Sequence, residues 1–197
     1  MADACRSPRG VTPDAERHVR RDTRGHGRRQ IRTARAPRTA ARHPGAAVVV
    51  TSSDAGDPAH PAADPLHQWT TGYETTFREL AGSGTRVAAL LDTPWPKGDP
   101  VDCAARNSLQ LRACAHHLPK ATRDATRGAA VRAAASTTAT TVIDPTPWLC
   151  APRTGTCPVV VGDTAVYRDG SHLSEEYAEA LAPALAPLLD RMFVPSS

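Results

Sequence analysis

One short stretch of the chain carries residues of the types that perform acid–base chemistry. Residues 167–174 read Tyr-Arg-Asp-Gly-Ser-His-Leu-Ser and place Asp169 three residues before His172. A carboxylate that fixes the tautomer of an imidazole, and an imidazole that removes a proton from a hydroxyl, form the base half of a serine-hydrolase site. Asp169 and His172 are therefore candidate catalytic residues. The alternatives are that Asp169 only caps the turn before the last helix and that His172 is a structural histidine.

Alternating strands and helices are predicted from residue 46 onward, and these would position the pair. Short apolar runs predict strands at residues 46–50, 86–91 and 140–144. A helix is predicted over residues 68–81, because Trp69, Tyr73, Phe77 and Leu80 share one face. A strand, a helix and a second strand in this order form a right-handed crossover unit of a parallel sheet.

Functional loops in parallel sheets follow the carboxyl ends of the strands. This rule directs attention to residues 51–56 and 92–99. Within the second loop, we interpret Asp92 as an ordinary turn former. Trp95, and Trp148 further along the chain, are interpreted as lid or core residues.

The second half of the body is predicted to contain two more helices and a hairpin. One helix is predicted from Pro119 to about Ala135. The hairpin joins residues 159–161 to residues 165–167. Ser174 is predicted to cap the last helix, which Pro183 and Pro187 should bend or break. The buried stripe of that helix is predicted to comprise Tyr177, Leu181, Leu185, Leu188 and Met192.

Four of the five cysteines form two close pairs, Cys103 with Cys114 and Cys150 with Cys157. Neither pair has the spacing of a zinc ribbon. Two short-loop disulfides are favoured, and they imply an oxidising compartment; free core thiols are the alternative. No metal site and no cofactor are predicted, since the pair at 116–117 (His-His) lacks a third ligand at useful spacing.

The chain joins two different compositions. Residues 1–45 hold 12 arginines against 4 acidic residues, whereas residues 46–197 hold 12 basic against 16 acidic residues. The first segment has no periodicity and is predicted to be disordered. The alternatives are a nucleic-acid-binding arm and a segment never selected as protein. We predict no nucleic-acid partner, because the segment lacks lysine and interleaved aromatic residues.

The sequence shows no stretch that could span a bilayer and no apolar core of a secretory signal. Paired cysteines of the kind found in exported proteins are at odds with the lack of such a signal. We therefore expect this sequence to be the C-terminal part of a longer, exported protein.

Several motifs, taken in order, carry a family resemblance. They are Asp-Thr-Pro-Trp-Pro at residues 92–96, the two cysteine pairs with Trp-Leu before Cys150, and the stretch containing Asp169 and His172. Residues 46–193 resemble the C-terminal portion of an SGNH (GDSL-like) hydrolase domain. More narrowly, they resemble the domain fused behind membrane acyltransferases that O-acylate cell-surface glycans. The resemblance implies an α/β fold, a three-layer α/β/α sandwich with a parallel sheet, here incomplete. It also implies an extracytoplasmic, membrane-associated location.

The resemblance assigns His172 as general base and Asp169 as its partner in acyl transfer through a serine ester. The family's nucleophile stands in a Gly-Asp-Ser turn, and this tripeptide is absent from the sequence. Residues 162–164, Gly-Asp-Thr, are interpreted as the hairpin turn. Ser52 and Ser53 match the loop on the oxyanion side, where the family's asparagine is missing.

The sequence thus predicts two domains, a disordered segment 1–45 and an SGNH-like domain 46–197. We expect a fragment of an acyl-transfer or esterase domain that is inactive alone for lack of the serine. Its implied partners are an acylated glycan or acyl acceptor, and a membrane acyltransferase domain normally in the same chain. The alternative is a non-catalytic SGNH-like domain that binds glycan.

Overall fold

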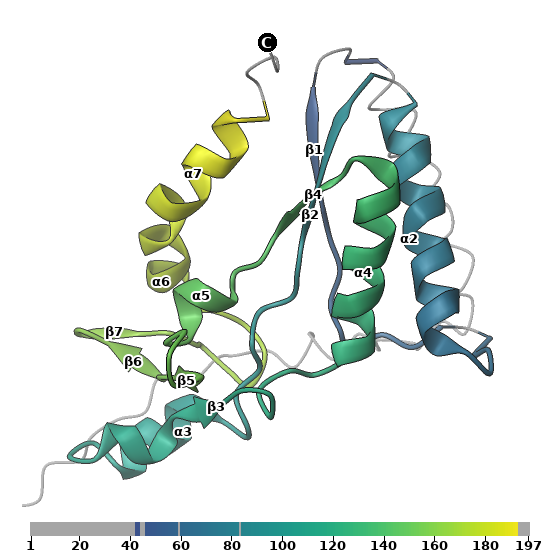
Figure 1. Cartoon of the computed structure of the whole chain (residues 1–197). Helices are drawn as coiled ribbons and strands as arrows, with labels where there is room; N and C mark the ends of the chain where they lie inside the picture. The colour runs from purple at the N-terminus through teal and green to yellow at the C-terminus, as the bar shows by residue number, and fades with distance from the viewer. Residues whose placement is uncertain (1–41, 44–45, 59, 83, 193–197) are drawn as a thin grey trace, which may run out of the picture. The chain divides into compact units, whose positions relative to one another are not determined.

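The computed structural model describes residues 42–43, 46–58, 60–82 and 84–192 (Figure 1). The Arg-rich segment, predicted to be disordered, lies outside the described residues apart from 42–43. Within the described part, no helix combines the length and the apolar character that crossing a membrane requires.

A three-stranded parallel sheet forms the centre of the fold. Its strands are β1 (Ala47–Thr51), β2 (Arg86–Leu90) and β4 (Thr141–Ile143), in the order β1-β2-β4. All three strands predicted from apolar runs are confirmed. Because the strands are parallel, their carboxyl ends meet at one edge of the sheet.

Helices cover both faces of this sheet, as Figure 1 shows. On one face α2 (Pro65–Ala81) and α4 (Ala125–Thr138) bury Phe77 and Val131 against Val87 and Ala89 of β2. On the other face α7 (Ala182–Asp190) packs near Ala88. Alternate residues of β2 therefore pack against the helices on opposite faces of the sheet. The predicted three-layer α/β/α arrangement is confirmed.

Two helix starts differ from their predictions because aspartate side chains cap these helices at other positions. The helix α2 begins at Pro65, where the Asp64 carboxylate accepts the His67 amide. The helix α4 begins after Asp124, whose carboxylate accepts the amides of Thr126 and Arg127. Pro119 instead lies in the turn before it. A side chain that satisfies free amides of the first turn fixes where a helix begins.

The remaining short elements lie outside the central sheet. They are α3 (Pro100–Arg106), η1 (Leu111–Cys114), β3 (His116–His117), α5 (Thr146–Leu149), β5 (Thr156–Cys157), β6 (Val160–Val161) and β7 (Thr164–Ala165). Antiparallel pairing joins β3 to β5 and β6 to β7. Both predicted disulfides are present, Cys103–Cys114 with an S–S distance of 1.99 Å and Cys150–Cys157 with 2.00 Å.

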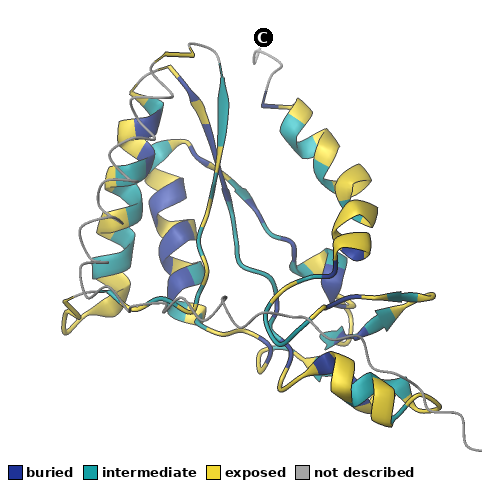
Figure 2. Ribbon diagram, turned by 180° about the vertical axis from the view of Figure 1, so that it is seen from behind, coloured by how far each residue is buried: buried dark blue, intermediate teal, exposed yellow. Residues whose placement is uncertain are grey.

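The last helical segment is broken, as its prolines predict. It consists of α6 (Glu175–Ala180) and α7, separated at Leu181, and Pro183 lies in the first turn of α7. Pro187, in contrast, stands inside α7 without ending it. Of the predicted buried stripe, Tyr177 and Met192 are buried, whereas the three leucines are half-buried. Figure 2 shows that α7 is more exposed than α4, which has a buried side.

Candidate active site

Asp169 and His172 lie in a tight loop between β7 and α6. The Arg168 amide donates to the His172 carbonyl at 3.0 Å, and an antiparallel bridge joins Tyr167 to Leu173. Ser174 ends the loop, and its hydroxyl accepts the Tyr177 amide at 3.1 Å as the predicted cap of α6. The loop is therefore closed at its base, and both candidate side chains project from a fixed turn.

The carboxylate of Asp169 orients the His172 ring. Its Oδ1 accepts the backbone amides of Ser171 and His172, each at 2.9 Å. Both carboxylate oxygens also lie 2.9 Å from His172 Nδ1. With Nδ1 donating to the carboxylate, Nε2 is the ring nitrogen that can accept a proton. The structure thus brings the two candidate residues together in the arrangement that a general base requires.

The charge of Asp169 follows from the same contacts. The pKa of its carboxyl falls to about 2, chiefly because the Ser171 amide donates to it, and His172 adds a further hydrogen bond. Asp169 is therefore ionised at neutral pH. The side chains of Asp169 and His172 are 43% and 60% exposed, so the pair is open to a partner from solution.

The loop after β2 contacts the loop that carries Asp169 and His172. Buried Tyr167 donates its hydroxyl to the Pro94 carbonyl at 3.0 Å. A Cβ on Gly170 would stand 3.3 Å from the Gly98 carbonyl oxygen, so the two loops are in close contact there. Residues 92–99, predicted to form a functional loop, therefore contact the loop that carries Asp169 and His172.

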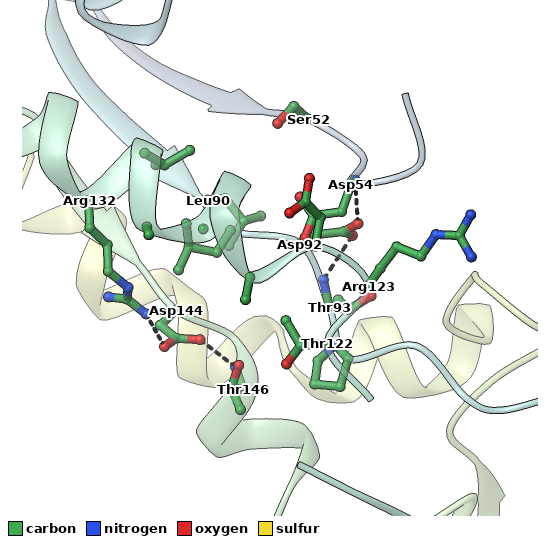
Figure 3. A pocket seen from close by; sticks show the side chains of 17 residues that line it. Ser52, Asp54, Leu90, Asp92, Thr93, Thr122, Arg123, Arg132, Asp144 and Thr146 are labelled. Carbon is green, nitrogen blue, oxygen red and sulfur yellow. Dashed lines mark hydrogen bonds and ion pairs between the residues drawn. The ribbon is translucent and has the colours of Figure 1, made fainter. Parts of the chain in front are cut away.

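A cavity of about 340 Å³ opens at the carboxyl ends of the three strands (Figure 3). Acidic residues follow each strand, and basic residues come from α4 and the segment before it. The polar lining comprises Ser52, Asp54, Asp92, Arg123, Arg132 and Asp144. Asp169 and His172 do not line this cavity. In the described part of the chain, no group of three or more His, Cys, Asp and Glu residues is placed to hold a metal ion.

Asp92 connects two loops, which the turn-former interpretation did not anticipate. Its Oδ2 accepts the Asp54 amide at 2.8 Å and the Trp95 indole at 3.0 Å, and its Oδ1 accepts the Thr93 amide at 2.9 Å. One carboxylate thereby holds the loop after β1 against the loop after β2. Trp95 is also covered by the Arg123 guanidinium, 5.4 Å from its ring centre.

Arg127 holds the other side of the loop after β1. Its guanidinium is buried, donates to the Ser53 carbonyl at 2.7 Å and to the Gly56 carbonyl, and lies 3.9 Å from the Trp69 ring centre. The carbonyl of Ser53 and the amide of Asp54 belong to one peptide group. Arg127 and Asp92 therefore fix that peptide plane from both sides.

Asp54 has an unusual acidity for an aspartate. Its carboxyl lines the cavity, and its pKa rises to about 6, first because of burial and then because of the negative charge of Asp92. A backbone hydrogen bond from Asp124 and the positive charge of Arg127 oppose this rise only in part.

Neither serine of the loop after β1 contacts His172. The Ser52 hydroxyl lies 2.8 Å from the Tyr73 hydroxyl, and the Ser53 hydroxyl accepts the Ala55 amide at 3.2 Å. The predicted hairpin turn is present: Gly162, at a φ of 61°, and Asp163 join β6 to β7, and Thr164 already pairs with Val161. The sequence analysis pointed to residues 51–56 without singling out Asp54, and it missed Asp124 and Arg127. For Asp54 the available signal was an acidic residue in the loop after a predicted strand.

Comparison with known proteins identifies the family. A family model described as "SGNH domain (fused to AT3 domains)" matches residues 9–187. This chain belongs to that family. The recognition made from the residues is therefore confirmed, as is the relation to acyltransferases. A search of the curated proteins found no match.

A solved structure shares the fold of this chain. It is the periplasmic domain of a lipopolysaccharide acetyltransferase from Salmonella ser. Paratyphi A, with 14% sequence identity and a TM-score of 0.60. The match covers 82% of this chain and 61% of that chain, so this SGNH chain spans less than two thirds of its structural neighbour.

Proposed function

We propose that this SGNH domain takes part in the transfer of acyl groups to or from the hydroxyl groups of cell-surface glycans. The observation that carries the proposal is the pairing of His172 Nδ1 with both oxygens of Asp169 at 2.9 Å. That geometry leaves Nε2 to take the proton of a hydroxyl, while Asp169 stabilises the imidazolium that forms.

The chemistry also needs a nucleophile, and the sequence contains no Gly-Asp-Ser. The described serines near the sheet edge support no replacement, because Ser52 and Ser53 have other partners. Loss of a catalytic serine lowers the rate by several orders of magnitude. We therefore propose that these 197 residues alone do not turn over an ester.

The family and the cysteines support a proposal for where the reaction takes place. The family's SGNH domains are fused to AT3 domains, so we propose a membrane acyltransferase domain as the working partner. Two disulfides are typical of an oxidising compartment, which supports a location outside the cytoplasm.

An ester assay tests the catalytic part of the proposal. Release of p-nitrophenol from p-nitrophenyl acetate should rise linearly with ester concentration, because no acyl-enzyme forms. His172→Ala should change that rate no more than His67→Ala does, His67 being another exposed histidine. Saturable hydrolysis that only His172→Ala abolishes would show that the chain has its own nucleophile.

A binding assay tests the substrate class. The chain should be retained on an O-acetylated glycan and released by the free acetylated sugar. Retention together with no hydrolysis in the complete membrane protein would favour the non-catalytic binding domain. Failure of retention would contradict the glycan proposal.

A further inference from the structure

A disulfide-closed loop exposes an apolar side chain between two basic ones. Leu109 is 98% exposed and lies in the loop that Cys103–Cys114 closes. Arg106 and Arg112, three residues to either side, are also exposed. Arg106 has one partner, Asp102 at 3.5 Å, in an ion pair with both side chains largely in solvent.

The exposure of Leu109 is imposed by the backbone. The Gln110 amide donates to the Asn107 carbonyl at 2.8 Å, which makes a tight turn with Leu109 at its tip. Asn107 in turn donates its amide and its side-chain Nδ2 to the Cys103 carbonyl, at 3.0 and 2.9 Å. These bonds and the disulfide keep the leucine from folding back onto the protein.

Single exposed leucines are common on protein surfaces, so the surroundings decide whether this one matters. A hollow of about 450 Å³ joins Leu111 and Arg112 to Val160 of the hairpin. Val161, the next residue, is 44% exposed. Leu109, Leu111, Arg112, Val160 and Val161 are termed the Leu109 surface. Both α3 and the β6–β7 hairpin extend away from the central sheet (Figures 1 and 2).

Charge separates the part of this surface that lies in residues 97–120 from the rest of the folded body. Residues 97–120 hold four basic residues against two acidic ones. The other residues of 46–197 hold 8 basic against 14 acidic ones. An anionic surface therefore attracts the segment that carries Leu109 and repels the remainder, which would orient the domain.

We propose that the Leu109 surface docks on a lipid membrane with anionic headgroups. Leu109 enters the boundary of the acyl chains, while Arg106 and Arg112 pair with lipid phosphates. Exposed aliphatic groups flanked by basic side chains suit this interface, because each meets the part of the lipid that matches it. The proposal does not depend on the reaction proposed above.

The test places a reporter at the tip of the turn. Leu109→Trp is compared with Leu66→Trp, since Leu66 is 44% exposed at the start of α2, outside this surface. The probe is a vesicle of equal parts phosphatidylcholine and phosphatidylglycerol with brominated acyl chains. The indole at position 109 should shift its emission to shorter wavelength and be quenched. Emission of Leu66→Trp should change no more than that of the unsubstituted chain.

A second pair of variants measures the contribution of the side chain. Leu109→Asp should weaken vesicle binding at least about tenfold, whereas Leu66→Asp should leave it unchanged. All variants keep the Arg-rich segment, so its attraction to the vesicle is the same in each. The proposal is overturned if the chain stays in solution, if the indole at 109 is not quenched on bound vesicles, or if both aspartate variants bind alike.

Discussion

At the residue scale, two aspartates with opposite shifts of pKa have opposite roles. Asp169 accepts backbone amides and a histidine at the protein surface, so it stays ionised down to about pH 2 and keeps His172 oriented. Asp54 is partly buried beside a second carboxylate, so its ionised form is disfavoured below about pH 6. The surroundings of Asp169 therefore suit a permanent negative charge, and those of Asp54 suit a carboxyl that keeps its proton up to about pH 6.

The acidity of Asp54 predicts how stability depends on pH. The pKa rises from 3.8 when the chain is unfolded to about 6 when it is folded, so between these values only the folded state holds the proton. The free energy of unfolding should therefore fall as pH rises from about 4 through about 6. Asp54→Asn should remove this slope and stabilise the protein at pH 7 by on the order of 1 kcal/mol, the full shift being reduced by solvent screening.

Urea unfolding at several pH values measures this effect, with the exposed Asp57→Asn as control. A slope that survives in Asp54→Asn and disappears in Asp57→Asn would contradict the assignment.

At the element scale, the start of α4 determines the geometry of the cavity edge. Asp124 caps the helix through the amides of Thr126 and Arg127, and Arg127 then reaches the loop after β1. The cap therefore affects both the helix and the loop that it supports.

Removal of this cap should destabilise the protein measurably. Asp124→Ala leaves two amides of the first turn without a partner and should lower the free energy of unfolding by about 0.5–2 kcal/mol. Asp190→Ala, at the exposed end of α7, is the matched control and should cost much less. Urea denaturation of both variants measures the difference. Equal losses in the two variants would show that Asp124 does not act as a cap.

At the scale of the whole molecule, the structure combines a sheet with its helices and a group of short elements held by disulfides. The first part has its own core on both sides of β2. In the second part, a separate cluster contains Cys150, Cys157, Leu149 and Tyr167. Tyr167 also bonds to the loop after β2, so the second part supports the candidate catalytic loop.

The two disulfides should contribute unequally to stability. The entropy that a disulfide removes from the unfolded chain makes the longer Cys103–Cys114 loop the more stabilising one, but by only about 0.4 kcal/mol. Burial acts the other way, since Cys150 and Cys157 are 4% and 0% exposed, whereas in the other pair only Cys114 is buried, at 4%. Truncation of Cys150 and Cys157 therefore removes one more buried side chain, whose core packing is worth about 1 kcal/mol. The double substitution of Cys150 and Cys157 by Ala should therefore lower the free energy of unfolding more than that of Cys103 and Cys114. Denaturant unfolding of each double variant, with its remaining disulfide formed, measures the free energy of unfolding. A larger decrease for the variant that lacks Cys103 and Cys114 would contradict the prediction.

The sequence by itself determined the features that depend on neighbouring residues. Apolar runs gave the three strands, and the offset of three residues between Asp169 and His172 placed both in one turn. The close cysteine pairs gave both disulfides. Each of these features is set within a short segment, where the spacing of residue types limits the geometry.

Only the tertiary structure decided which distant groups meet. Asp92 contacts Asp54 across 38 positions, and Arg127 reaches Ser53 across 74. The order of strands in the sequence pointed to the two loops at this edge of the sheet, but it does not say which side chains meet there, because that depends on how the strands and α4 pack together. For the same reason, the sequence indicates only a turn former at Asp92 and gives no role for Arg127.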